Sequence, residues 1–212
     1  MKSESTVLLS SAYLPSIEYM ALILKHENVI IEKDESYLKQ TYRNRCSILS
    51  ANGILNLSIP VTKPDGNNTK TKRITILNTE AWYINHWRAM YSAYSGSPFF
   101  LYYKDDLESF FAGSHNNLLD YNTGLTNELL SLIGIKSNIT YSLSFTQPNS
   151  VLNDYRFSLS PKIMNNSNNF DSYTQVFSNK FNFMPNLSII DLLFNMGPDT
   201  LEYLMAINDN TK

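Results

Sequence analysis

The stretch VLLSSAYLPSIEYMALILKHENVII, residues 7–31, decides the predicted fold. It begins with an apolar run that continues to Tyr13 and ends before Pro15, as expected of a strand that leads into a loop. Apolar residues three and four positions apart follow, with Ser16 before them as an N-cap, and they predict a helix. The β-branched run Val29–Ile31 predicts a second, buried strand. A strand, a short helix and a strand in this order place the two strands parallel and adjacent in one sheet.

Further strands are predicted from alternation and turn chemistry. Residues 45–49 and 55–61 alternate apolar and polar side chains around Asn52-Gly53. This pattern predicts a hairpin with a type I′ turn, because that turn needs positive φ at both positions. Two more strands are expected at residues 73–77 and 139–145, and the polar segment before the first of them predicts a loop.

The middle of the chain is expected to be helical. One helix places five apolar residues on one face: Ile84, Trp87, Met90, Tyr91 and Tyr94. Two further helices are predicted over residues 98–111 and 117–133, the last of which ends before a glycine.

The C-terminal part carries helix signals of its own. Ser188 and Asp191 match a capping box, which predicts that Asp191 caps a short helix ended by Gly197. Pro198 is expected to begin a last helix that runs through Ile207.

The sequence therefore predicts an α/β protein. The N-terminal β-α-β unit and the hairpin form a partly parallel, Rossmann-like sheet, and the middle and C-terminus add helices. We expect one domain, with an α/β core over about residues 5–147 and an extension over about 148–212 packed on it.

Composition and charge exclude several classes of protein. The chain has 212 residues, of which 43% are hydrophobic, enough for a substantial core. Its net charge of −2 gives no global basic field for nucleic acid, and no apolar run is long enough to span a membrane. The first residues lack the apolar core of a signal peptide, so we expect a cytoplasmic protein. Cys46 is the only cysteine, which excludes an intrachain disulfide.

No motif assigns a cofactor. The three histidines lack metal-ligand spacing, so no metal site is predicted. A Walker A motif and the glycine triplet of dinucleotide- and flavin-binding folds are both absent. The sequence leaves the cofactor and the oligomeric state open.

The first candidate site is the turn after the first strand, with Tyr13 as a catalytic and Tyr19 as a substrate-binding residue. In an open α/β sheet this turn faces the ligand crevice, where a tyrosine can stack on a base or sugar and donate its hydroxyl. The alternative is that both rings belong to the core. The turn lacks the histidines and glycine of many nucleotidyl-transferring folds, so that mechanism is not predicted.

The second candidate site is a cluster of polar residues before the third strand. Arginine binds phosphate or carboxylate in bidentate geometry, and asparagine binds amides or hydroxyls. The two arginines are two residues apart and are expected on one face of the strand. The alternative is ion pairs with the acidic segment 32–35. The candidate substrate-binding residues here are Lys39, Tyr42, Arg43, Asn44 and Arg45.

The third candidate is His86, as a general acid or base at the wall of a cleft. Arg88 follows it, and Tyr94 lies two turns further along the same helix; both are candidate substrate-binding residues. The alternative is a structural histidine whose ring nitrogens are hydrogen-bonded within the protein.

Taken together, these residues resemble the WbqC-like family of bacterial proteins. The resemblance covers almost the whole chain, in order, and segment 165–169 is its least typical part. The matching segments are Tyr13-Leu-Pro-Ser-Ile-Glu-Tyr19, Tyr42-Arg-Asn-Arg-Cys46, Leu57-Ser-Ile-Pro-Val61, His86-Trp-Arg88, Ala93-Tyr94 with Ser97-Pro98-Phe99-Phe100, Tyr103-Lys-Asp-Asp-Leu107, Tyr173-Thr-Gln-Val-Phe177 and Asn186-Leu-Ser-Ile-Ile-Asp-Leu-Leu-Phe-Asn-Met-Gly-Pro198.

The family is named from an O-antigen biosynthesis context. The resemblance implies a group-transfer enzyme that acts on nucleotide-activated sugars or related phosphorylated intermediates of surface polysaccharide synthesis. Under this hypothesis Arg43→Ala weakens ligand binding and leaves stability nearly unchanged. The alternative is a non-catalytic binding or assembly protein that uses an aromatic surface, with Phe99, Phe100, Tyr102 and Tyr103.

Overall fold

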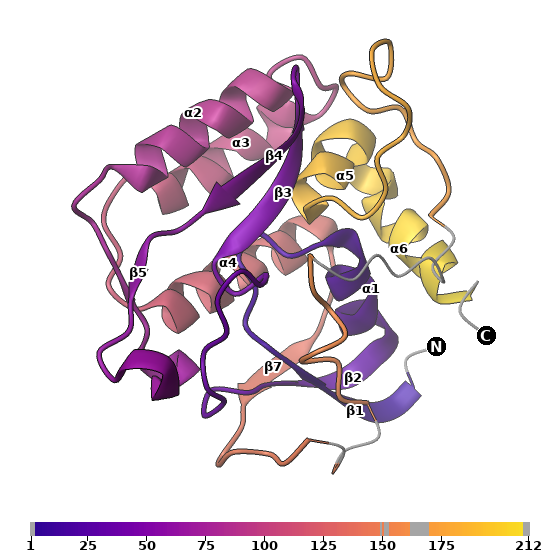
Figure 1. Ribbon diagram of the computed structural model, residues 1–212. Coiled ribbons are helices and arrows are strands. Elements are labelled where there is room, and N and C mark those ends of the chain that lie inside the picture. The colour runs from indigo at the N-terminus through magenta and orange to yellow at the C-terminus, as the bar shows by residue number, and fades with distance from the viewer. Residues whose placement is uncertain (1–2, 149, 151–152, 162–169, 210–212) are drawn as a thin grey trace.

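A computed structural model describes residues 3–148, 150, 153–161 and 170–209 of the chain. Its N-terminal unit consists of β1 (Ser3–Leu9), α1 (Ile17–Lys25) and β2 (His26–Ile31). The two strands pair in parallel, which confirms the predicted β-α-β unit. A third parallel strand, β7 (Asn138–Tyr141), pairs with the other edge of β2 and gives the order β1-β2-β7 (Figure 1).

Helix α1 forms where local chemistry predicts it. The Ser16 hydroxyl accepts a hydrogen bond from the Tyr19 backbone N–H at 3.3 Å, as an N-cap does. Ile17, Met20 and Ile23 are fully buried, so the helix has one apolar face toward the core. The helix ends where His26 takes an extended conformation and β2 begins without a loop.

Antiparallel ribbons follow the parallel sheet. The first pairs β3 (Arg45–Ser50) with β4 (Gly53–Ser58), which confirms the predicted hairpin. The turn is not type I′, however, because Gly53 has a φ of 100° while Asn52 has no positive φ. The hairpin instead has a turn followed by a glycine, a type that needs positive φ only at that glycine. The second ribbon is short and pairs β5 (Val61–Thr62) with β6 (Thr75–Ile76).

Five helices are described besides α1. They are α2 (Trp82–Tyr94), α3 (Phe100–Glu108), α4 (Leu118–Ile133), α5 (Ile189–Met196) and α6 (Thr200–Asp209). In Figure 1 the parallel sheet lies at one end of the molecule, α2 and α3 lie at the other, and the β3–β4 hairpin runs between them. The mixed α/β class with helices in the middle and at the C-terminus is confirmed.

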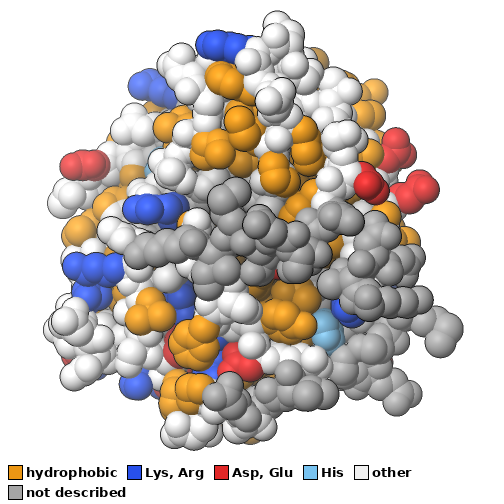
Figure 2. Space-filling view, turned by 45° about the vertical axis from the view of Figure 1, so that its right-hand side comes forward, with side chains coloured by type: hydrophobic (Ala, Val, Ile, Leu, Met, Phe, Trp, Pro, Cys, Tyr) orange, Lys and Arg blue, Asp and Glu red, His pale blue; other side chains and the backbone are white. Residues whose placement is uncertain are grey.

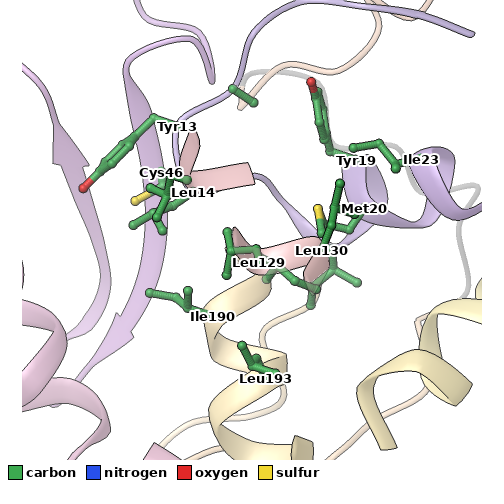
Figure 3. Close-up of a cluster of buried hydrophobic side chains, with 14 of the residues drawn as sticks. Tyr13, Leu14, Tyr19, Met20, Ile23, Cys46, Leu129, Leu130, Ile190 and Leu193 are labelled. Atoms are coloured by element: carbon green, nitrogen blue, oxygen red, sulfur yellow. The ribbon is translucent and has the colours of Figure 1, made fainter. Parts of the chain in front are cut away.

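The core lies between the sheet, the hairpin and the helices. Figure 3 shows side chains from α1, β3, α4 and α5 that converge, among them Met20, Cys46, Leu129 and Ile190. Each of these is at most 1% exposed. Complete burial of a side chain of this size contributes about 1.5–3 kcal/mol, so this cluster is a large part of the driving force.

Several expected elements differ in length. The strands expected at 73–77 and 139–145 are reduced to Thr75–Ile76 and Asn138–Tyr141. The helix expected at 98–111 is α3 followed by a 3₁₀ turn, and 3₁₀ turns also form at 66–68 and 71–73 in the expected loop. The last helix begins with a 3₁₀ turn at Gly197, where a Cβ would lie 2.5 Å from the Phe99 ring, so only glycine fits.

The buried face of α2 differs in part from the predicted one. Met90 and Tyr94 are buried as expected, but Ile84 and Tyr91 are 39% and 51% exposed. Trp82 and His86 are buried in their place. This buried face contains the imidazole of His86 and the indole of Trp82. A pattern of apolar residues does not identify it, because histidine counts as polar. His86 therefore points into the protein.

The predicted capping box at the start of α5 is also wrong. Ser188 is at the N-cap position, but its hydroxyl donates to the Leu14 carbonyl instead of capping the helix. Asp191 is completely buried, and its carboxylate accepts hydrogen bonds from other segments. Because α5 is buried on all sides, Asp191 in its first turn faces the protein interior and not the exposed helix end that a capping residue would occupy.

Candidate functional site

The structure distributes the predicted site residues over four places and leaves Arg88 outside all of them. Tyr13 and His86, the two predicted catalytic residues, do lie together: the Tyr13 hydroxyl is 2.8 Å from Nδ1 of His86. Both are buried, with exposed fractions of 0% and 7%. Tyr13 and Tyr19 point away from each other (Figure 3), so these two tyrosines do not line one ligand site.

The Tyr13–His86 pair is a neutral hydrogen bond. Burial lowers the pKa of His86 to about 4, against a weaker opposing effect of a hydrogen bond with the Ser58 backbone. Burial likewise raises the pKa of Tyr13 well above its usual value. A neutral imidazole and a protonated phenol at neutral pH fit the structural-histidine alternative as well as they fit a poised acid–base pair.

The turn that carries Tyr13 is strained. Leu14 has a φ of 41°, in the left-handed region that a bulky residue rarely adopts. Such a conformation costs about 1–3 kcal/mol and persists only where the surroundings hold it. Here the Ser188 hydroxyl donates to the Leu14 carbonyl, and the Ile189 N–H donates to the carbonyl of Pro15. The C-terminal segment thus fixes the turn after β1.

Arg43 lies in a buried ion pair at the carboxyl ends of the parallel strands. Its Nε and Nη2 donate to the two carboxylate oxygens of Glu35 at 2.9 and 2.8 Å, and Nη2 also donates to Ser10. Both side chains are at most 3% exposed. The ion pair with the acidic segment, the alternative stated above, is therefore present.

A second arginine at the same sheet edge was not predicted. Arg156 is fully buried and donates from Nε and Nη2 to the two oxygens of Asp154, while Nη1 lies 3.5 Å from Glu32. Glu32 is held further by the hydroxyl of Ser142, at 2.7 Å. Asp154 is two residues from Arg156, but Glu32 is 124 residues from Arg156 and 110 from Ser142, and no spacing pattern links these three residues.

The two arginines share a small hollow. It has a volume of about 10 Å³ and is lined by Arg43, Arg156 and the rings of Tyr19, Tyr42 and Tyr155, among others. A cavity of this size holds about one water molecule. The carboxyl edge of the sheet, where open α/β folds bind ligands, is thus closed by polar side chains in this conformation.

Lys39, Asn44 and Arg45 line a much larger groove. We call the groove of about 550 Å³ between segments 37–45 and 58–67 the basic groove. Its cations are Lys39, Arg45 and Lys63, and none of the described lining residues is acidic. The volume falls within the range of small-molecule sites, about 300–1,000 Å³.

Two polar side chains of the basic groove are held by hydrogen bonds to other residues of its lining. Nε of Arg45 donates to the Ser58 hydroxyl at 3.0 Å, and Nδ2 of Asn44 donates to the carbonyl of Ile59 at 2.8 Å. Tyr37 lies in the wall, and burial raises its pKa to about 12, so its phenol stays protonated. Gln40, also in the lining, has a φ of 60°, a second left-handed non-glycine position.

Arg43 and Arg45 therefore do not share a face. The chain between them enters β3, which turns Arg43 toward Glu35 and Arg45 toward the basic groove. Arg88 is exposed on α2, and the structure gives it no hydrogen bond or ion pair with another described residue.

Tyr94 belongs to a fourth place, a buried carboxylate cluster. Its hydroxyl donates to Oδ1 of Asp191 at 2.9 Å, while the Tyr173 hydroxyl and Nε2 of Gln175 donate to Oδ2 at 2.6 and 2.8 Å. Burial raises the pKa of Asp191, and the three hydrogen bonds oppose that shift. Sequence reasoning missed this cluster, because the capping-box match gave Asp191 a local explanation.

Two further properties concern binding partners. Among the described residues, no three His, Cys, Asp or Glu side chains come together as a metal site would require. No helix within the described ranges is long and apolar enough to cross a membrane.

Comparison with known proteins gives the relationship of the chain. An uncharacterised protein of Mycobacterium tuberculosis is 25% identical to it, and the match covers 95% of this chain and 97% of that protein. No solved structure matches the chain. The model of the WbqC-like protein family matches residues 10–164 and 160–203, which include all four places described above. Because these matches span most of the sequence, the chain belongs to the WbqC-like protein family.

Proposed function

We propose that this protein binds a nucleotide-activated sugar, or a related phosphorylated small molecule, in the basic groove and acts on it as a group-transfer enzyme of surface polysaccharide synthesis. The observation that carries the proposal is the charge of the groove. Three cations line about 550 Å³ of accessible space without a described carboxylate among them. A diphosphate needs such a surface, because each phosphate oxygen accepts hydrogen bonds from cationic donors.

The neighbouring charges favour the same ligand. Asp65, which adjoins the lining residue Gly66, is paired with Arg73 at 2.6 Å and leaves the three groove cations unneutralised. Lys63 donates to the side chain of Asn67, a neighbour in the groove lining. The phenol of Tyr37 and the amides of Gln40 and Asn44 supply neutral groups for a base or a sugar.

The described lining of the groove contains groups that can bind a ligand, but no histidine or carboxylate that could transfer a proton. The closest candidate is His86, which is hydrogen-bonded with the backbone of Ser58 behind the groove wall. His86 does not line the groove, so a role in acid–base chemistry requires that the wall opens when the ligand binds.

Exposed apolar side chains on α2 and α3 favour the second candidate function, a non-catalytic binding or assembly protein. Tyr91, Leu101 and Tyr102 are 51%, 69% and 76% exposed. Phe100 is completely buried and does not belong to this surface, contrary to the sequence-based hypothesis. Under this function the protein binds a partner and has no turnover.

The test is isothermal titration of the protein with UDP-glucose, GDP-mannose and the matching free sugars. We expect binding of at least one sugar nucleotide and a loss of about tenfold or more in Arg45→Ala, because a hydrogen bond to a charged group contributes about 1.5–3 kcal/mol. Lys104→Ala is the matched control, since Lys104 is a cation on α3 outside the groove.

Equal affinity of Arg45→Ala and the unaltered protein would exclude the basic groove as the phosphate site. Mass spectrometry of the titrated mixtures then separates the two functions. A transferred group in the products supports the enzyme, whereas tight binding with unchanged ligand supports the binding protein.

A further inference from the structure

A second cavity lies in the C-terminal part of the molecule. It has a volume of about 440 Å³ and is formed by residues within segment 172–183, which precedes α5 in the chain. Lys180 donates to the carbonyl of Ala51 in the turn of the β3–β4 hairpin. The basic groove is lined at the opposite end of that hairpin, by Arg45 and Ser58, so the two cavities are separate.

The floor of this cavity is rigid. Tyr173 and Gln175 are both anchored on the buried carboxylate of Asp191, at 2.6 and 2.8 Å. The amide of Gln175 also donates to the carbonyl of Met184 and accepts from its N–H, so its hydrogen-bonding capacity is used within the protein. A buried network with every member satisfied holds a surface in one geometry.

The lining combines aromatic rings with neutral polar groups. The rings are Tyr173, Phe181 and Phe183, and the first and last of these pack edge to face at 5.1 Å. The polar side chains are Ser172, Thr174, Ser178 and Asn182, for which the structure gives no side-chain hydrogen bond to another described residue. None of the described lining residues carries a charge.

Hydrophobic side chains are also visible on this part of the surface. Figure 2 shows them in the upper part of the face, where Figure 1 places the segment before α5. Phe181 and Phe183 are half-buried, so each ring is partly accessible.

We propose that this cavity binds an uncharged saccharide unit. A pyranose presents C–H groups on one face, which pack on aromatic rings, and hydroxyls at its rim, which bond with amides and alcohols. The described lining residues are uncharged, which matches a neutral ligand. The ammonium of Lys180 lies 5.3 Å from the centre of the Phe181 ring, but it already donates to the carbonyl of Ala51. A volume of about 440 Å³ suits one or two sugar rings.

The test is saturation-transfer NMR and titration of the full chain with glucose, galactose, N-acetylglucosamine, maltose and lactose. We expect at least one of these to bind, with an affinity about tenfold lower in Phe181→Ala and in Asn182→Ala, a change equivalent to about 1.4 kcal/mol. Asn182 is exposed, so its removal leaves the fold intact and keeps the test decisive if Phe181→Ala is unstable.

Two controls separate this site from the basic groove. Arg45→Ala should bind the neutral saccharide as the unaltered protein does, whether or not the groove binds sugar nucleotides. Tyr102→Ala removes an exposed ring from α3 and should also have no effect. The proposal is overturned if none of the five saccharides binds, or if binding is unchanged in both cavity variants. The proposal is also overturned if the Arg45→Ala variant binds sugars only when they carry a phosphate.

Discussion

The hydroxyl of Tyr13 lies 2.8 Å from Nδ1 of His86, although the two residues are 73 positions apart. The contact joins the strained turn after β1 to the buried face of α2. Its two groups are neutral and nearly inaccessible to water, so changes in either one should appear first in the stability of the protein.

The free energy of unfolding should depend on pH through His86. The folded pKa is about 4 and the unfolded value is about 6.5. Between these values the unfolded chain binds a proton that the folded protein does not bind, so stability falls as the pH falls. We expect a loss of up to about 3 kcal/mol from pH 6.5 to 4, measured by urea unfolding at a series of pH values. This contribution is constant at pH values well above 6.5, where neither state binds the proton.

The variant His86→Gln isolates that effect, because carboxylates also titrate in this range. We expect the pH dependence of the variant to be flatter than that of the unaltered protein between pH 6.5 and 4. Parallel curves would show that His86 does not stay neutral in the folded state.

Arg43→Ala should destabilise the protein by about 3–5 kcal/mol, because it leaves the buried carboxylate of Glu35 without its bidentate partner. The structure thus reverses the expectation from sequence that this change leaves stability nearly unaltered. The matched change Arg45→Ala should alter stability by less than about 0.5 kcal/mol, since Arg45 is only half-buried and bonds to a hydroxyl. Urea unfolding of both variants provides the comparison, and similar losses would contradict it.

The contrast between the two arginines shows where sequence reasoning ends. The β-α-β unit, the hairpin and the glycine that ends α4 follow from local periodicity and turn chemistry, which the chain carries in short windows. Arg43 points into the protein because Glu35 is folded against it, whereas Arg45 has no such partner among the described residues and points into the groove. Residue types alone singled out this polar cluster, but they did not predict its division between a buried ion pair and an open groove.

Contacts between distant segments account for the rest. Tyr13 and His86 were both selected from the sequence, but their contact depends on the actual buried face of α2, which contains polar rings. Glu32, beside Arg156, and Tyr94, beside Asp191, come from segments distant in the chain. Pairing of this kind arises from tertiary packing, and a single sequence contains no periodic signal for it.

Gln40→Gly should raise the free energy of unfolding by up to about 1 kcal/mol. Gln40 is exposed and has a φ of 60°, a conformation that costs about 1–2 kcal/mol for a residue with a Cβ and little for glycine. Part of this gain is offset by the greater entropy of glycine in the unfolded chain. Gln40→Ala keeps the Cβ and should leave stability nearly unchanged, so thermal unfolding of the pair tests the cause. A decrease in the glycine variant would contradict the assignment.

Cys46 should react with thiol reagents only when the protein opens. The side chain is 1% exposed, and burial raises the pKa of the thiol, so the reactive thiolate is scarce. We expect labelling by dithionitrobenzoate to be slow in buffer, fast in denaturing urea, and faster in Arg43→Ala than in the unaltered protein. Rapid labelling of the folded protein would show that the core around β3 opens easily.

Asp191→Asn should destabilise the protein by about 1–3 kcal/mol, although it changes only one atom of the side chain. The carboxylate accepts from Tyr94, Tyr173 and Gln175, and an asparagine amide offers a donor where one of these donors already points. If the Tyr94 hydroxyl turned to accept from that amide, its own proton would lose its acceptor on residue 191. Asp105→Asn is the matched control, since this carboxylate is 77% exposed and should lose less than about 0.5 kcal/mol.

The same variant distinguishes a structural role of the cluster from a direct role in saccharide binding. Asp191 lies beneath Tyr173 and Gln175 and does not line the cavity, so its replacement should weaken saccharide binding only as far as the cavity floor loses its order. Lower temperature restores the folded fraction of a destabilised variant and should therefore restore much of the binding, whereas Asn182→Ala should stay weak at every temperature. If cooling restores saccharide binding equally in Asp191→Asn and Asn182→Ala, then Asn182 does not contact the ligand. In that case the polar side chains at the rim of the cavity do not determine saccharide binding.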